Sequence, residues 1–192
     1  MTDEQAKLIK AAEAMATRAH GSQLYGTHPY AAHLRSVVRL CTPFGADAQI
    51  VAWLHDTLED TDLSPLEIEK EFDSQIRACV EKVTKRKGED SFVYWARLKE
   101  IPDGYVYFRA ALIVKAADRL ANIAACLGAP PNPRPVHVAS LMGQDYGTDP
   151  DKAAKLLQHY RDEHQEFVVA VRRVGLNDAL VDRASQLLTF WG

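Results

Sequence analysis

The segment Val51-Ala52-Trp53-Leu54-His55-Asp56-Thr57-Leu58-Glu59-Asp60-Thr61 places four ionisable side chains in the second half of an otherwise apolar helical stretch. In a continuous helix, His55 and Glu59 would lie one turn apart on one stripe, and Asp56 and Asp60 one turn apart on the next. A solvated polar stripe would explain any one of these residues. An adjacent His and Asp, followed by two carboxylates, favour a chemical site instead.

These side chains also indicate which cations such a site would prefer. Carboxylate oxygens suit hard divalent cations, and imidazole nitrogen shifts the preference toward transition metals. The pattern therefore favours Mn, Fe or Zn over Ca.

Composition predicts one ordinary globular domain spanning residues 1–192. The chain is 47% hydrophobic and 26% charged, and its net charge of -3 provides no overall field toward nucleic acid or a membrane. We therefore expect neither partner. Three cysteines without a Cys-x-x-Cys pair indicate reduced core thiols. The start of the chain lacks a signal-like segment, so we expect a cytoplasmic location.

Helical periodicity extends outward from the central segment, and strand alternation does not stand out, which predicts an all-α fold. Asp47 is the expected cap of the central helix, and Ser64-Pro65-Leu66-Glu67 reads as a capping box. The expected helices cover about 4–20, 30–40, 47–60, 65–72, 74–83, 91–101 and 105–127, then one long helix from 150 to 174 and a last one from 177 to 191.

Two further polar residues interrupt apolar helix faces. His33 shares a face with Val37 and Leu40, and a lone histidine there is more often a satisfied core residue than a ligand. A second histidine on an apolar face, His55, favours the ligand interpretation. Asp118 lies on an inward stripe of the longest helix, where a surface ion pair with its basic neighbour is the alternative.

The C-terminal third carries weaker signals. Residues 129–149 are rich in proline, glycine and polar side chains, which predicts a lid, a substrate loop or an irregular connection. Residues 150–192 read as C-terminal helices. For His159 and His164 we favour structural or surface roles.

The chain resembles the HD-domain metal-dependent phosphohydrolases, and most closely the (p)ppGpp hydrolase domain of RelA/SpoT-type enzymes. The resemblance is strongest over residues 11–125 and implies an HD-domain helical bundle. The chain is also similar to the stand-alone small alarmone hydrolases. The residues that carry it are Ala19-His20, Gln23, Pro29-Tyr30, His33, the run from His55 to Thr61, Val83-Thr84-Lys85 and the run from Lys115 to Arg119.

The resemblance implies specific roles for these residues. One metal ion, typically Mn²⁺ in this family, would be bound by His33, His55, Asp56 and Asp118. Two imidazoles and two carboxylates leave positions open on an octahedral ion for water and a phosphate oxygen. Glu59 and Asp60 would position and deprotonate the water, or protonate the leaving group.

Substrate contacts follow in part from the resemblance. Asn122 matches a family residue that contacts the nucleotide. We infer from their charge that Lys85, Lys115 and Arg119 face phosphate, although a solvated turn is the plainer interpretation of the loop at Lys85. Where the long enzymes carry an arginine-containing stretch that meets the base, this chain has Tyr25, which we expect to stack on the base.

The sequence therefore predicts hydrolysis of the 3′-pyrophosphate of an alarmone nucleotide, with (p)ppGpp as the first candidate and (p)ppApp as the second. An HD phosphohydrolase of another nucleotide is an alternative, disfavoured by Glu59-Asp60-Thr61 after the His-Asp pair. A non-enzymatic nucleotide sensor is the third hypothesis. The expected partner is a small-molecule nucleotide; the pattern sets no oligomeric state.

Overall fold

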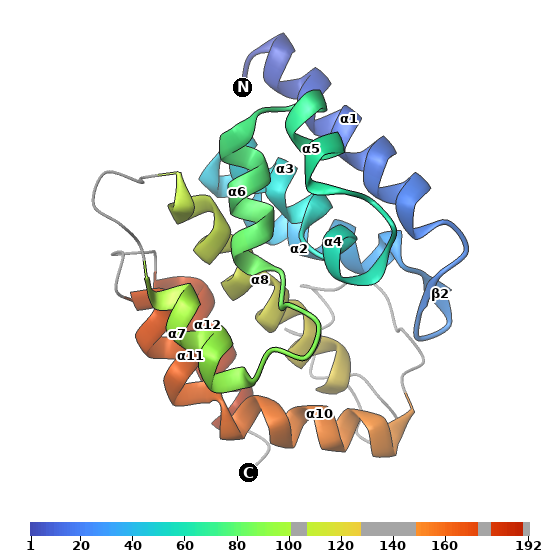
Figure 1. Ribbon diagram of the computed structural model, residues 1–192. Helices are drawn as coiled ribbons and strands as arrows, with labels where there is room; N and C mark the ends of the chain where they lie inside the picture. The colour runs from blue at the N-terminus through green and yellow to red at the C-terminus, as the bar shows by residue number, and fades with distance from the viewer. Residues whose placement is uncertain (101–106, 128–148, 173–177, 190–192) are drawn as a thin grey trace.

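Helix α8 (Phe108–Leu127) runs through the middle of the molecule, with other helices packed around it (Figure 1). From Ala110 to Leu127 every residue is buried except Lys115 and Asn122, which are partly exposed. A helix that is apolar on nearly all sides must be enclosed by other elements, and its alanines allow close approach. Lys115 and Asn122 mark the side on which α8 opens toward polar groups.

The structure is a computed structural model and describes residues 1–100, 107–127, 149–172 and 178–189. The all-α prediction is confirmed, with one short hairpin of β1 (Leu24–Tyr25) and β2 (His28–Pro29). The remaining elements are α1 (Asp3–His20), α2 (Ala31–Cys41), η1 (Thr42–Phe44), α3 (Ala46–Leu54), α4 (Thr57–Asp60), α5 (Pro65–Glu71), α6 (Ser74–Val83), α7 (Ser91–Lys99), α10 (Pro150–Asp162), α11 (His164–Arg172) and α12 (Asp178–Thr189).

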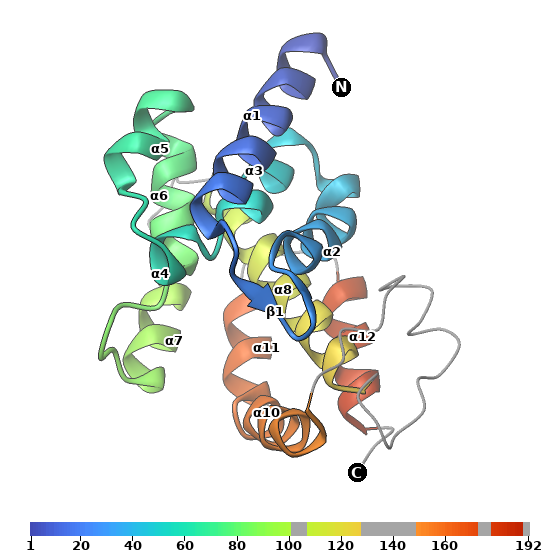
Figure 2. The ribbon, with the colours of Figure 1, turned by 90° about the vertical axis from the view of Figure 1, so that its right-hand side faces the viewer.

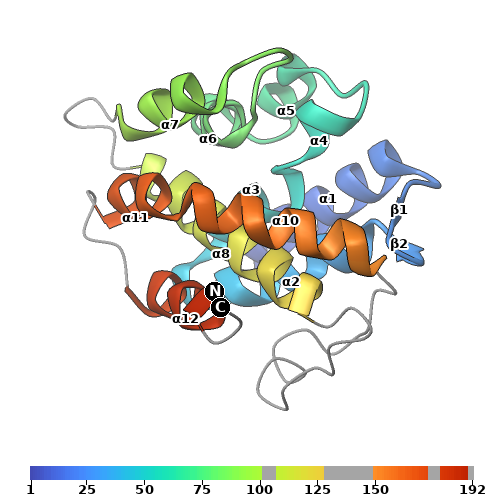
Figure 3. The ribbon, with the colours of Figure 1, turned by 90° about the horizontal axis from the view of Figure 1, so that it is seen from below.

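Two groups of helices cover α8. Helices α1, α2 and α3 pack together on one side, and α2, α3 and α6 contact α8 directly. Helices α10, α11 and α12 cover the other side, and α7 lies against α11, as Figures 2 and 3 show from two directions. N-terminal and C-terminal segments therefore meet across one central helix.

The central stretch is not one helix, which corrects the sequence-based expectation. Helix α3 ends at Leu54, and the single turn α4 begins at Thr57. His55 Nδ1 lies 2.8 Å from the carbonyl oxygen of Ala52, and Thr57 Oγ1 donates to that of Leu54 at 2.7 Å. These side chains form hydrogen bonds with carbonyl groups that a continuous helix would pair with backbone N–H groups.

This break changes the predicted spacing. The Asp60 N–H still donates to the Asp56 carbonyl at 2.9 Å, so this pair remains one helical turn apart. The Glu59 N–H donates to the same carbonyl at 3.2 Å rather than to that of His55. The expected continuous helix is therefore wrong at His55, and the one-turn spacing of Asp56 and Asp60 is kept.

Two other boundaries differ from expectation. Gly45, with a φ of 99°, occupies the N-cap position of α3 in place of Asp47, because the chain leaves η1 through a left-handed conformation that glycine adopts readily. The expected long C-terminal helix divides between α10 and α11 at Glu163. Arg119 donates to the carbonyl of Tyr160, a group that an unbroken helix would use itself.

The capping box of Ser64 and Glu67 is confirmed, and the three cysteines are free and buried. The predicted loop at 129–149 lies outside the described residues except for Asp149, which caps α10. Among the described helices, none has both the length and the apolar composition needed to cross a bilayer.

The capping box generates a stability prediction. Ser64→Ala removes the oxygen that accepts the Glu67 N–H, and we expect the free energy of unfolding to fall by about 1 kcal/mol in urea denaturation. Ser64→Thr keeps a capping hydroxyl and should lose clearly less. Equal losses in both variants would contradict a capping role.

Candidate metal centre

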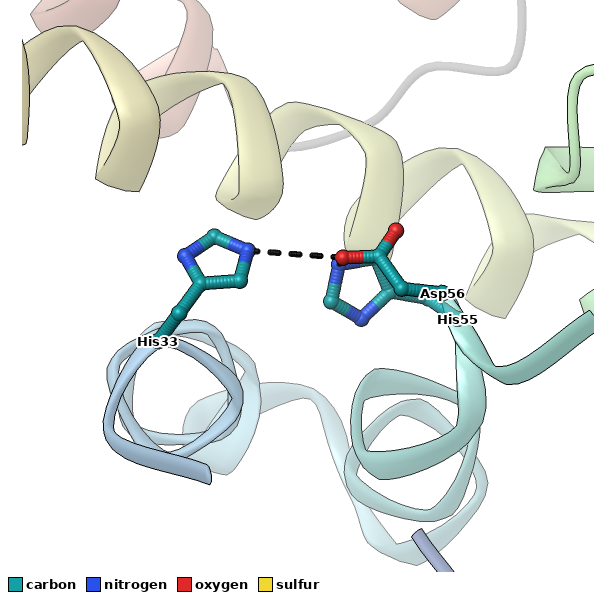
Figure 4. Close-up of side chains that lie close together, drawn as sticks. All are labelled: His33, His55 and Asp56. Carbon is teal, nitrogen blue, oxygen red and sulfur yellow. Dashed lines mark ion pairs between the residues drawn. The ribbon is translucent and has the colours of Figure 1, made fainter. Parts of the chain in front are cut away.

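His33 reaches the centre of the molecule from α2. Its side chain is 1% exposed, and Nε2 lies 3.3 Å from Asp118 Oδ1 and 3.7 Å from Asp56 Oδ2. Figure 4 shows the His33 ring directed from α2 toward Asp56, with α8 passing beside them. Three segments distant in sequence therefore meet at this imidazole.

His55 stands at the break between α3 and α4, and the break orients it. With Nδ1 facing the Ala52 carbonyl at 2.8 Å, the ring proton belongs on Nδ1 and the lone pair on Nε2. That Nε2 lies 3.1 Å from Asp56 Oδ2 and 3.6 Å from Asp118 Oδ1, yet it makes no hydrogen bond. A buried nitrogen lone pair facing two carboxylates is the arrangement of a metal ligand.

The residues present fit a divalent cation. His33, His55 and Asp56 each offer one ligand atom, and these atoms all lie within 4.8 Å of one another. Asp118 adds an oxygen near both imidazoles. Because all these atoms carry lone pairs, their convergence is favourable only if a cation or protons lie between them.

The pKa shifts of this cluster follow from that convergence. Burial opposes protonation of His55, but the carboxylates of Asp56 and Asp118 outweigh it and raise its pKa above the ordinary value. Burial opposes ionisation of Asp118, but Lys115 and the two imidazoles outweigh it and hold its pKa well below the ordinary value. The first shift favours the protonated imidazole of His55 and the second the ionised carboxylate of Asp118, so each follows from the attraction between opposite charges in the cluster.

Glu59 and Asp60, the predicted acid-base pair, lie on α4. The Glu59 carboxylate accepts the backbone N–H of Lys85 at 2.9 Å, and Asp60 Oδ2 accepts the Tyr30 hydroxyl at 3.0 Å. Although solvent reaches Glu59, partial burial raises the pKa of its carboxyl above the ordinary value, opposed by the Lys85 N–H and the Lys115 ammonium. A carboxyl group with a raised pKa suits proton transfer.

Tyr25 and Asn122 form a chain of hydrogen bonds that ends on a candidate ligand. The Tyr25 hydroxyl donates to Asn122 Oδ1 at 2.6 Å, and Asn122 Nδ2 donates to Asp118 Oδ1 at 2.6 Å. The Tyr25 ring also stacks on His33, with centroids 4.5 Å apart and planes at 12°. The two predicted nucleotide contacts therefore adjoin the ligand cluster.

Two of the predicted phosphate contacts lie together beside Asp118. Lys115 Nζ is 3.3 Å from Asp118 Oδ2, and Lys85 Nζ donates to Ser91 Oγ at 2.9 Å. Both side chains line a cavity of about 210 Å³ that Glu59 and Asp118 also border. A larger open groove of about 1230 Å³ adjoins it and shares Glu59 and Lys85.

Arg119 borders the same cavity but is 3% exposed and engaged elsewhere. Its guanidinium donates to the Tyr160 carbonyl and lies 4.7 Å from the centroid of the Phe167 ring. Burial lowers its pKa, against the charge of Glu163. In this arrangement Arg119 joins α8 to α10 and α11.

The sequence pattern predicts no role in this site for Tyr30, and for His159 it favours a structural or surface role. Tyr30 belongs to the residues that carry the family resemblance, and its hydroxyl lies against Asp56 and Asp60. His159 lines the cavity with Glu163, 3.4 Å away. The helical pattern of 150–172 does not predict that His159 and Glu163 line the cavity, because it does not indicate which end of α8 the helix crosses.

Comparison with known proteins agrees with the geometry. The HD domain family model matches residues 10–146. The human guanosine-3′,5′-bis(diphosphate) 3′-pyrophosphohydrolase MESH1 is 35% identical over 131 residues, covering 64% of this chain and 71% of that protein. GTP pyrophosphokinase rsh of Brucella ovis is 29% identical over 193 residues, covering 97% of this chain and 25% of that protein.

A solved structure shares the fold. It is described as a metazoan ortholog of SpoT that hydrolyzes ppGpp, and it superposes with a TM-score of 0.69 over 96% of each chain at 20% identity. At that identity the likeness concerns the arrangement of helices alone.

The ligand cluster predicts stabilisation by a divalent cation. With Mn²⁺ as the probe at about 100 times its Kd, we expect stabilisation of about 2.7 kcal/mol, seen as a rise in Tm. His55→Ala should abolish the rise, because it removes a lone pair from the cluster. His164→Ala, at a histidine that contacts Ser185, should keep it. An undiminished rise in His55→Ala would exclude this cluster as the binding site.

Proposed function

Because this chain belongs to the HD domain family, we propose that it is a metal-dependent hydrolase that removes pyrophosphate from the 3′ position of an alarmone nucleotide, (p)ppGpp first and (p)ppApp second. The observation that carries the proposal is the convergence of His33, His55, Asp56 and Asp118 beside Glu59 and Asp60. The human relative, named as a 3′-pyrophosphohydrolase of guanosine-3′,5′-bis(diphosphate), supports the choice of substrate.

We propose Mn²⁺ as the cation, held by His33, His55, Asp56 and Asp118. When bound, it would lower the pKa of a water molecule and offset negative charge on the phosphorus under attack. The chemistry of the donor set, two imidazoles and two carboxylates, supports a transition metal of this kind. A cytoplasmic location remains a prediction from the sequence.

The side chains of α4 would handle the proton. In our proposal Glu59 accepts a proton from the attacking water, while Asp60, held by Tyr30, orients that water. A bond forms between the water oxygen and phosphorus, and the bond between phosphorus and the ribose 3′ oxygen breaks. The 3′ oxygen then takes up the proton that Glu59 received, so no covalent enzyme intermediate is needed.

The neighbouring groups would bind the substrate. Lys85 and Lys115 border the cavity next to Glu59 and Asp118, so their ammonium groups are placed to offset phosphate charge. Tyr25 and Asn122 lie on the other side of Asp118, where we propose that they contact the nucleoside. Arg119 would act on the cavity mainly by fixing α10 against α8.

The first test is an end-point assay of the purified protein with Mn²⁺, in which ppGpp and ppApp and their products are separated by chromatography. We expect the wild type to release pyrophosphate with GDP or ADP, which also identifies the purine. Asp118→Asn should abolish turnover and remain all-helical by circular dichroism, because it removes a ligand charge. Asp151→Asn makes the same change at an exposed position and should keep wild-type activity. Turnover by Asp118→Asn, or none by the wild type with bound metal, would refute the proposal.

The pH dependence tests the role of Glu59. A general base acts in its ionised form, so kcat/KM should rise with pH and level off, with a midpoint above the ordinary glutamate value of 4.5 because the pKa is raised. Glu59→Gln should remove this limb and lower kcat by about 10²-fold or more, with Mn²⁺ still bound. The control Glu71→Gln should keep the wild-type profile. A limb that falls with pH and depends on Glu59 would make it the acid instead.

A further inference from the structure

The Tyr30 hydroxyl lies between a candidate metal ligand and a candidate proton-transfer group. Its oxygen is 2.7 Å from Asp56 Oδ2 and 3.0 Å from Asp60 Oδ2, both within hydrogen-bonding distance. Hydrogen bonds from a neutral donor to a carboxylate are stronger than those between neutral groups. One side chain at the N-terminal boundary of α2 therefore links Asp56, which directly precedes α4, with Asp60 on α4.

The oxygen that Tyr30 contacts is also the one that faces the imidazoles. Asp56 Oδ2 lies 3.1 Å from His55 Nε2 and 3.7 Å from His33 Nε2. The phenol has a single proton, so it donates to Asp56 or to Asp60 at any moment, and the shorter distance favours Asp56. Both carboxylates are nevertheless drawn toward one fixed point, which restricts their side-chain rotation.

The Tyr30 ring is itself held on several sides. It stacks on His20, with centroids 4.2 Å apart and planes at 8°, and His20 Nδ1 lies 2.8 Å from Gln23 Oε1. The Tyr30 N–H donates to the Gln23 carbonyl at 2.9 Å. Edge contacts with Tyr25 and His33 complete the surroundings. His20 and Gln23, which the metal cluster does not use, thereby fix where the hydroxyl points.

Helix α4 requires tertiary contacts of this kind to be stable. It has only four residues, and a single helical turn is unstable without tertiary contacts. The backbone fixes the separation of Asp56 and Asp60 along the chain but leaves the carboxylate orientations free. Tyr30 supplies that orientation from one side, and the Lys85 N–H holds Glu59 from the other.

We propose that Tyr30 is a positioning residue that orients Asp56 for metal binding and Asp60 for proton transfer, with His20 and Gln23 holding its ring. The part concerning Asp60 rests on the proposed function; the part concerning Asp56 requires only that a divalent cation binds. Residues that orient metal ligands typically change metal affinity or activity by about 10–100-fold when they are replaced.

The test uses Tyr30→Phe, which removes the hydroxyl and keeps the ring stack on His20. Mn²⁺ titration followed by electron paramagnetic resonance, without nucleotide, should show a Kd about 10-fold or more above that of the wild type. Thr189→Val is the control for this titration, because it also removes one hydroxyl, and the Thr189 hydroxyl donates to the Ser185 carbonyl on α12 away from the ligand cluster. Its Mn²⁺ affinity should equal that of the wild type.

Activity at saturating Mn²⁺ tests the second part. Tyr30→Phe should lower kcat about 10-fold with KM within about twofold of the wild type. Combined with Asp60→Asn, it should lower kcat by less than the product of the two single effects, since both changes affect one interaction. His20→Ala keeps the hydroxyl but removes the stack, and should produce the same changes to a smaller degree.

These measurements distinguish the role of Tyr30 at Asp56 from its role at Asp60. Wild-type Mn²⁺ affinity in folded Tyr30→Phe would overturn the role at Asp56, and multiplicative effects in the double variant would overturn the role at Asp60. A lowered Tm with unchanged Kd and kcat would mean that Tyr30 only stabilises the fold. If the wild type cleaves no alarmone, the proposed function fails while the titration still decides the role at Asp56.

Discussion

The buried meeting of two imidazole nitrogens with two carboxylate oxygens is the constraint on which this structure depends. Lone pairs brought together away from water repel one another unless positive charge lies among them. The molecule presents them from three elements: His33 from α2, His55 and Asp56 from the break after α3, and Asp118 from α8. Because α8 is buried along most of its length, Asp118 is held rigidly, and the other elements pack against that reference.

The chain reaches this arrangement by interrupting its own regular structure. At the end of α3, His55 and Thr57 take backbone carbonyls, which stops the helix and turns the His55 lone pair toward Asp56 and Asp118. At the end of α10, Arg119 takes the Tyr160 carbonyl, which brings Glu163 to the cavity wall. In both places a polar side chain replaces a helical hydrogen bond, so the backbone remains satisfied while the site gains a particular orientation.

The sequence predicts the all-α class, most helix boundaries and the side chains that gather at the centre. Apolar periodicity identifies buried faces, and His33, His55 and Asp118 stand out because they interrupt such faces. The break at His55 and the division at Glu163 could not be predicted this way, since each depends on one side chain binding a particular carbonyl. The hydrogen bond between Tyr30 and Asp60 could not be predicted either, because it depends on how α2 is placed against α4. Apolar periodicity does not contain this tertiary relation.

Charge explains why such a site would need a divalent cation to receive a pyrophosphate group. Asp56, Glu59, Asp60 and Asp118 place four carboxylates around the cluster, and a phosphate chain approaching them would be repelled. Lys85 and Lys115 are the ammonium groups that border the cavity among its described lining residues, and they offset about half of that charge. Two negative charges remain, and a divalent cation would balance them. Binding of the cation and of an anionic substrate should therefore be thermodynamically coupled, each increasing the affinity for the other.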